Sequence, residues 1–170
     1  MWRIFQEERM NMMIPQEPAA YAKISGSSKY PGIQGTLTIY DTYGGSILMI
    51  EIADIAGAGG EKENGFLGLH IHEGSSCSGS QTDPFADAGG HDNPQGRPHP
   101  QHAGDLPPLL VNEGAAWMMV YTGRFYPEDV VGKTVIVHGM PDDFHSQPSG
   151  DSGEKIACGE IKEWEMNTAR

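Results

Sequence analysis

Long hydrophobic runs are absent from this sequence. No run of about 18 apolar residues occurs, so we expect no transmembrane helix. The first residues also lack the apolar segment of a secretory signal, which favours a cytoplasmic location and leaves an extracytoplasmic one open. Cysteine is scarce as well. Cys77 and Cys158 are the only two in the chain, and their spacing alone fits either two free thiols or one disulfide.

Basic residues are also few. The chain has 11 lysines and arginines against 23 aspartates and glutamates, which gives a formal net charge of −12. Nucleic acids and anionic membrane surfaces are therefore poor candidates for partners, because proteins bind both mainly through positive charge. The average charge would also repel an anionic substrate, so attraction of an anion would need a local positive site.

Turn-forming residues are abundant. The 170 residues include 23 glycines and 12 prolines, and 38% of the chain is hydrophobic. This composition is typical of one domain built from many short strands and turns. Residues 1–18 hold a cluster of methionines beside Gln, Glu and Pro, which predicts a flexible N-terminal tail. Residues 19–170 predict a single folded domain.

Alternating apolar and polar residues predict eight strands, at residues 20–25, 35–40, 46–54, 68–73, 108–111, 115–121, 133–138 and 156–164. Turn residues at 41–45 and 112–114 predict two hairpins, because Asn, Asp and Gly close antiparallel pairs. We therefore expect an all-β fold, an eight-stranded antiparallel barrel or sandwich. Residues 74–106 and 140–154 lack periodicity, and loops this long in a compact domain usually carry function.

Histidine supplies the strongest motif signal. His70 and His72 lie two residues apart in a predicted strand, so their side chains point to the same face. Leu69 and Ile71 suit a core, which places both imidazoles on the opposite face, where they could chelate one metal ion. A His-x-His pair occurs in many proteins without a metal and is a weak signal on its own.

A second group lies in the first long loop and consists of His91, His99, His102 and Asp105. Three imidazoles and one carboxylate form a set suited to tetrahedral zinc. A metal ion would also order a loop that lacks a core of its own. His138, at the end of a predicted strand, offers a further imidazole that could join the His-x-His pair.

Together these residues resemble the copper/zinc superoxide dismutase family. The matching stretches, in chain order, are GLHIHEG (68–74), GGHDNP (89–94), PHPQHAGDLPPL (98–109), GKTVIVHGMPDD (132–143) and SGEKIACGEI (152–161). The resemblance spans roughly residues 20–164, and its motifs are highly specific in combination. It implies a Greek-key, immunoglobulin-like β-barrel. It also implies conversion of superoxide anions into oxygen and hydrogen peroxide by redox cycling of copper.

The resemblance implies a role for each of these side chains. Copper would be bound by His70, His72, His91 and His138. Zinc would be bound by His91, His99, His102 and Asp105. His91 would bridge the two ions as an imidazolate, a form that two adjacent cations favour. Asp142 would link the two sets through hydrogen bonds to His70 and His99, as carboxylates beside metal-bound histidines commonly do.

The resemblance also implies a disulfide between Cys77 and Cys158, which would tie the first long loop to the last strand. The family has an arginine three residues before the second cysteine, beside copper, where it draws in superoxide. Lys155 occupies that position here and keeps the charge without the planar fork of arginine. We therefore expect His91 and Lys155 to act in catalysis, with the lysine affecting the rate more than the reaction.

A non-catalytic copper- and zinc-binding domain of the same fold is the alternative. Some members of the family lose copper ligands, but all four positions hold histidine here, which favours the enzyme. The resemblance implies superoxide anion as substrate and leaves a homodimer as a candidate assembly.

Overall fold

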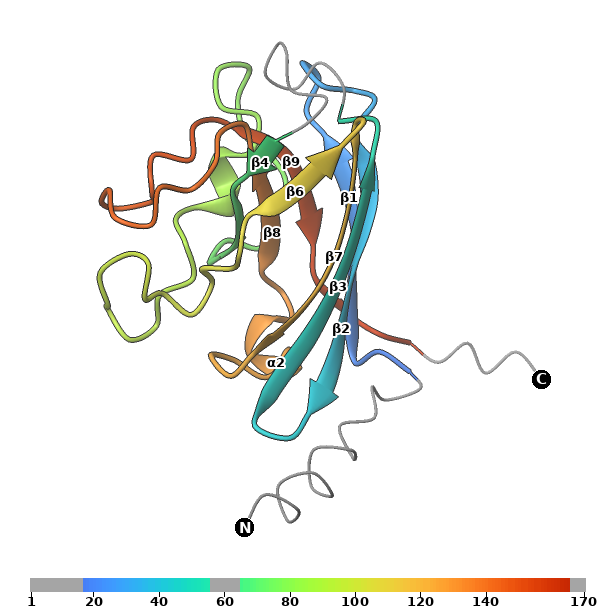
Figure 1. Cartoon of the computed structure of the whole chain (residues 1–170), viewed down its shortest axis with the longest axis vertical. Helices are drawn as coiled ribbons and strands as arrows, with labels where there is room; N and C mark the ends of the chain where they lie inside the picture. Colours follow the sequence, from blue (N-terminus) through green and yellow to red (C-terminus); the bar gives the residue numbers. More distant parts are fainter. Residues whose placement is uncertain (1–16, 56–64, 166–170) are drawn as a thin grey trace, which may run out of the picture.

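The computed structural model describes residues 17–55 and 65–165. Residues 1–16, which form most of the predicted N-terminal tail, lie outside this part of the chain. The described residues form one antiparallel ten-stranded sheet with two short helical turns, η1 (Ala86–Ala88) and α2 (Pro127–Val130) (Figure 1). The predicted all-β class is confirmed. Among the described residues, no helix is long and apolar enough to span a membrane.

The first three strands pair in chain order. They are β1 (Ala20–Gly26), β2 (Gln34–Thr42) and β3 (Gly45–Ala53). The predicted hairpin turn at 41–45 is confirmed, but it is tighter than expected because Thr42 and Gly45 already pair across the two strands. β3 continues the sheet by pairing with β7 (Ala115–Thr122), which returns to β6 (Leu109–Asn112) through the second predicted hairpin.

One extended segment closes the sheet into a barrel. β4 (Gly65–Leu67) pairs with β6, whereas β5 (Leu69–His72) pairs with β8 (Thr134–His138). Both ends of the strand order therefore belong to one stretch of chain, which changes partners at Gly68. A β-carbon at Gly68 would lie 2.9 Å from the Ser152 side chain, so the close approach of Ser152 favours glycine at this point. The sequence predicts a strand at 68–73, and β4 is an addition to it.

The last predicted strand, 156–164, is divided in the structure. β9 (Lys155–Glu160) lies between β8 and β1, and the short β10 (Lys162–Glu163) pairs with the start of β1. Ile161 separates them because its backbone pairs instead with Gly132 and Lys133, while its side chain is buried in the core.

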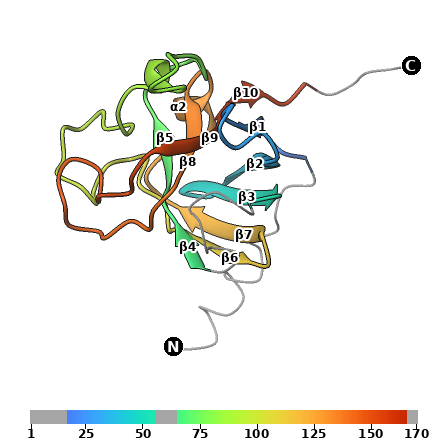
Figure 2. The ribbon, with the colours of Figure 1, turned by 90° about the horizontal axis from the view of Figure 1, so that it is seen from above.

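The core fills the inside of the barrel, and the two long loops lie together on its outside, next to β5 and β8 (Figure 2). Leu69 and Ile71 point into the core. His70 and His72 point to the other face, yet their exposed fractions are only 0% and 2%. The loops that cover β5 therefore enclose a layer of histidines between themselves and the barrel wall.

Candidate metal centre

Two groups of four buried side chains bring their ligand atoms within 4.8 Å of one another. The first group is His70, His72, His91 and His138, from β5, the first long loop and β8. The second group is His91, His99, His102 and Asp105, all from the first long loop. His91 belongs to both groups. The structure thus brings together every side chain of the two predicted sets, while their roles as copper and zinc ligands stay a prediction.

Backbone hydrogen bonds hold the first long loop against the side of β5 that does not pair with β8. Ile71 bonds to Gly104 and Asp92, and Glu73 donates to the carbonyl of Gly90, at distances of 2.8–2.9 Å. These contacts place His91 beside His72, and Asp105 beside His70, as isolated β-bridges. The position of the ligands is therefore set by main-chain pairing as well as by side-chain contacts.

The first group presents ring nitrogens toward a common point. His72 Nδ1 faces the carbonyl of Gly89 at 2.9 Å, and His138 Nδ1 faces that of Gly153 at 3.3 Å. Since a carbonyl can only accept, each Nδ1 carries the proton and each Nε2 has a free lone pair. These two Nε2 atoms are 3.2 Å apart, where two lone pairs repel unless a cation lies between them. His70 Nδ1 and His91 Nε2 are buried without a hydrogen-bond partner.

The second group has the spacing of a tetrahedral site. Asp105 Oδ1 lies 2.8 Å from His91 Nδ1 and 3.2 Å from His102 Nδ1. The two imidazole Nδ1 atoms of this pair are 3.4 Å apart, and His99 Nδ1 lies 3.1 Å from Asp105 Oδ2. Ligand atoms about 2.0–2.1 Å from zinc at the corners of a tetrahedron lie roughly 3.3 Å from one another. The residues present therefore fit zinc.

Burial keeps the imidazoles of three residues in the first group, His70, His72 and His138, neutral. It lowers the pKa of His70 and of His72 to about 2 and that of His138 to about 4, and neighbouring imidazoles add to the effect. Burial acts to raise the pKa of Asp105, but hydrogen bonds from the His91 ring and the His102 backbone outweigh it and lower that pKa to about 2. At neutral pH the centre offers imidazole lone pairs and one carboxylate, which suit copper and zinc.

Asp142, from the second long loop, connects the two groups. One of its oxygens accepts a hydrogen bond from His70 Nε2 at 2.8 Å, and the other accepts one from His99 Nε2 at 2.9 Å. These bonds leave the Nδ1 atom of each ring for a metal. Gly150 passes so close that a β-carbon there would lie 2.0 Å from the Asp142 carboxylate, and its φ of 67° also favours glycine.

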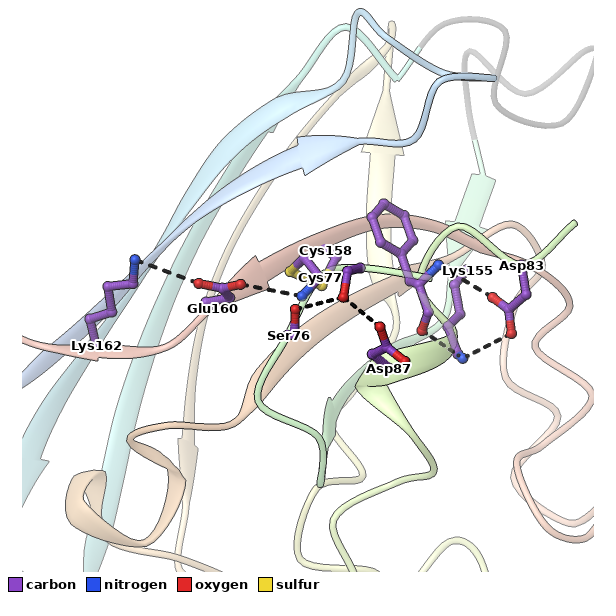
Figure 3. The surroundings of a disulfide bond; sticks show 10 residues. Ser76, Cys77, Asp83, Asp87, Lys155, Cys158, Glu160 and Lys162 are labelled. Atoms are coloured by element: carbon purple, nitrogen blue, oxygen red, sulfur yellow. Dashed lines mark hydrogen bonds and ion pairs between the residues drawn. A yellow bond between two sulfur atoms is a disulfide. The ribbon is translucent and has the colours of Figure 1, made fainter. Parts of the chain in front are cut away.

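Cys77 and Cys158 form a disulfide that closes a sequence separation of 81 residues and ties the first long loop to β9 (Figure 3). Lys155, at the start of β9, pairs with His138 across the sheet, and its charge helps to lower the pKa of that histidine. Its ammonium group donates to the carbonyl of Phe85 at 3.0 Å. The lysine is thus held beside the first group by the loop that the disulfide anchors.

Sequence reasoning misses the side chains that hold the first long loop from behind. The guanidinium of Arg124 donates to the carbonyls of Pro100, His102 and Asp105. Gln147, in the second loop, makes hydrogen bonds with both the N–H and the carbonyl of His99, at 3.0 and 2.7 Å. Neither contact leaves a recognisable sequence motif. The partners of Arg124 and Gln147 are backbone carbonyls and amides, which residues of every type carry.

The seventh histidine, His145, lies apart from both groups. Its side chain is 78% exposed and its Nδ1 lies 2.8 Å from Asp143 in the second long loop.

Comparison with known proteins agrees with this geometry. The family model described as "Copper/zinc superoxide dismutase (SODC)" matches residues 33–161. The "Superoxide dismutase [Cu-Zn]" of Deinococcus radiodurans is 32% identical over 145 residues, which cover 75% of this chain and 76% of that protein. The "Extracellular superoxide dismutase [Cu-Zn]" of Rattus norvegicus is 28% identical over 84% of this chain and 62% of its own length.

Among solved structures, the "Cu/Zn superoxide dismutase from Brucella abortus" superposes with a TM-score of 0.70. The alignment covers 84% of this chain and 99% of that one, with 26% sequence identity. The likeness therefore extends over most of this chain and almost all of that one.

Proposed function

The chain belongs to the copper/zinc superoxide dismutase family, a family of oxidoreductases, and on this premise we propose that it converts two superoxide anions and two protons into oxygen and hydrogen peroxide. His70, His72, His91 and His138 would hold copper, and His91, His99, His102 and Asp105 would hold zinc. When bound, copper would supply one-electron redox chemistry, and zinc would hold the shared ring by its charge.

The residues of the chain divide the remaining work. His91 Nε2, buried and without a hydrogen-bond partner, is the atom at which a proton would be held and delivered during turnover. Its Nδ1, 2.8 Å from Asp105, keeps the ring anchored on the zinc side. Lys155 would attract and orient the anion beside His138. Asp142 would fix the orientation of His70 and His99.

The shared position of His91 is the observation that carries this proposal. A protein that only stores copper needs one ligand set, whereas a single ring in contact with two sets couples the two sites. A non-catalytic domain of the same fold is disfavoured because all four side chains of the first group are present, buried and converging.

The purified protein, loaded with copper and zinc, should therefore bind one ion of each kind and remove superoxide. We expect superoxide decay, followed by pulse radiolysis or stopped flow, to be fast with the loaded protein and no faster than the spontaneous decay with protein that carries zinc alone. Elemental analysis of the same samples gives the metal content. A loaded protein that fails to accelerate the decay would support the storage domain instead.

The location of the protein stays a prediction. One of the relatives compared above is bacterial, and the other is a mammalian protein named as extracellular. The sequence favours the cytoplasm, whereas disulfides persist most readily in oxidising compartments.

The same proposal extends to a homodimer formed through the outer face of β4, β6 and β7. This face carries a group of large apolar side chains that are 39–60% exposed, namely Phe66, Leu110, Trp117, Met119 and Tyr121. Aromatic side chains bury 150–250 Å² each, so the three half-exposed ones, Phe66, Trp117 and Tyr121, contribute roughly 300 Å² together. Leu110, Met119 and a rim of neighbours would supply the rest of the ~800 Å² per partner that a stable interface buries. β4, β6 and β7 lie next to one another on the side of the barrel that continues from β3 (Figure 2).

Charge favours a second copy on this face. Two chains of net charge −12 repel each other over most of their surface, so contact is easiest where apolar side chains gather. Glu51, an acid that touches the group, accepts a hydrogen bond from Trp117 Nε1 at 3.1 Å. We therefore expect the wild-type protein to have twice the 18.4 kDa chain mass.

Trp117→Glu should convert that dimer into a monomer, because it places a charge at the centre of the buried face. Tyr126→Glu adds the same charge at an exposed aromatic residue outside the group and should leave the dimer intact. Sedimentation equilibrium at micromolar concentration measures both. A monomeric wild type, or equal dissociation of the two variants, would exclude this interface.

A further inference from the structure

The ammonium group of Lys155, which lies beside the first histidine group, has two partners in the first long loop. Lys155 Nζ donates to the carbonyl of Phe85 at 3.0 Å and lies 3.5 Å from Asp83 Oδ2. Both contacts appear in Figure 3, where the loop passes over the start of β9. Residues 139–154 contain no lysine or arginine, so the second long loop adds no positive charge of that kind to the same side of the centre.

The two partners differ in character. Phe85 is buried and packs with Ala88, Ile136 and Cys158, so its carbonyl is a neutral and fixed acceptor. Asp83 carries a full negative charge, and its side chain is 51% exposed, whereas that of Lys155 is only 17% exposed. The carboxylate is therefore the more solvent-exposed member of this ion pair and can compete with a dissolved anion for the ammonium group.

Local hydrogen bonds hold Asp83 in this position. Its backbone N–H donates to Ser80 Oγ at 3.0 Å, and its carbonyl accepts hydrogen bonds from the backbone N–H groups of Ser80 and Ala86. Its Oδ1 accepts the backbone N–H of Phe85 at 3.4 Å, which leaves Oδ2 turned toward Lys155. The same turn thus presents both the fixed carbonyl and the competing carboxylate.

We propose that Asp83 is an internal counter-ion that competes with anionic ligands for Lys155 and so limits the affinity of the centre for anions. This inference rests on the proposed function, in which Lys155 attracts superoxide. An ammonium group has three N–H donors, and one of them is committed to Phe85. A small anion gains full access to the others only when the Asp83 carboxylate gives way. Asp83 is thus a positioning residue that acts through Lys155.

The test is the binding of azide, a small anion, to the copper- and zinc-loaded protein, followed by visible absorption. Asp83→Asn keeps the shape of the side chain and removes its charge. We expect a roughly 2- to 5-fold lower Kd for azide, the size expected for a partly exposed ion pair. The second-order rate with superoxide should rise by a similar factor at low ionic strength, and the gain should shrink as salt is added.

Asp87→Asn is the matched control. It removes one charge from the same loop, but its carboxylate contacts the Ser78 hydroxyl instead of Lys155. Asp87→Asn should change the Kd for azide much less, and Asp83→Asn should have no effect in a Lys155→Met background. Equal effects of the two single variants, or a full effect without Lys155, would overturn the proposal. If the loaded protein binds azide as expected but leaves superoxide unchanged, the proposed function fails and the role of Asp83 stands.

Discussion

His91→Ala is expected to lose zinc and copper together. The ring of His91 contacts Asp105 and His102 on one side, and on the other it stacks on His70 with ring centres 3.8 Å apart. Its removal takes one ligand from each set and exposes the lone pairs of the remaining rings to one another. Losing only an outer partner commonly weakens metal binding 10- to 100-fold, so the loss of a shared ligand should exceed about 100-fold at both sites.

Metal content after equilibration with both ions, measured by mass spectrometry of the elements, checks this expectation. His72→Ala is the sharpest control, because His72 contacts His138 and Gly89 and has no hydrogen bond to the second group. It should lose copper and keep zinc. His70→Ala should also keep most of its zinc. Some zinc should be lost, because Asp142 loses its hydrogen bond with His70 and then orients His99 less firmly. Zinc content in His91→Ala as high as in wild type, with an unchanged copper spectrum, would refute the shared ligand.

The second large effect is expected on stability when the disulfide is removed. Cys77 and Cys158 close a loop across a sequence separation of 81 residues. In the chain-entropy model a loop of this size lowers the free energy of the folded state, relative to the unfolded one, by roughly 4–5 kcal/mol. Cys77→Ser should lower the free energy of unfolding by about that amount, which is a large share of the 5–15 kcal/mol typical of a domain.

Urea denaturation of the metal-free protein measures this loss without contributions from bound ions. Dithiothreitol should destabilise the wild type to the level of Cys77→Ser and leave the variant unchanged. Ser78→Ala, next to the cysteine, serves as a control for local disturbance. A midpoint for Cys77→Ser that equals the one for Ser78→Ala would show that the disulfide adds little to stability.

The ligand sets could be predicted from the sequence because metal chemistry restricts residue type. His70 and His72 on one strand face, and the run from His91 to Asp105, leave few side chains that can serve as ligands. Many of the strands could be predicted from alternation for a similar reason, since β1, β2, β6 and β7 bury one face more than the other. The place of Lys155 beside the centre is implied by the resemblance, through the family's arginine three residues before the second cysteine.

Two kinds of contact could not be predicted from the sequence. They are the pairing of backbone groups between strands and the hydrogen bonds that side chains make to backbone groups. β4 has only three residues, too few for a two-residue period to appear, and its partner β6 lies far along the chain. Arg124 and Gln147 bind carbonyls and amides of the first long loop, which any residue carries. Asp83 lies in a segment without periodicity, so its approach to Lys155 depends on how the loop folds.

The pairing between the first long loop and β5 has a consequence for self-association. Strands with an unpaired edge recruit other chains into extended sheets, and natural proteins cover such edges. Here the cover consists of the backbone around Gly90, Asp92 and Gly104, held in place by the residues that would bind zinc. Detachment of that loop would uncover a strand edge with alternating apolar side chains. The side chains proposed to hold zinc therefore also protect this chain against aggregation.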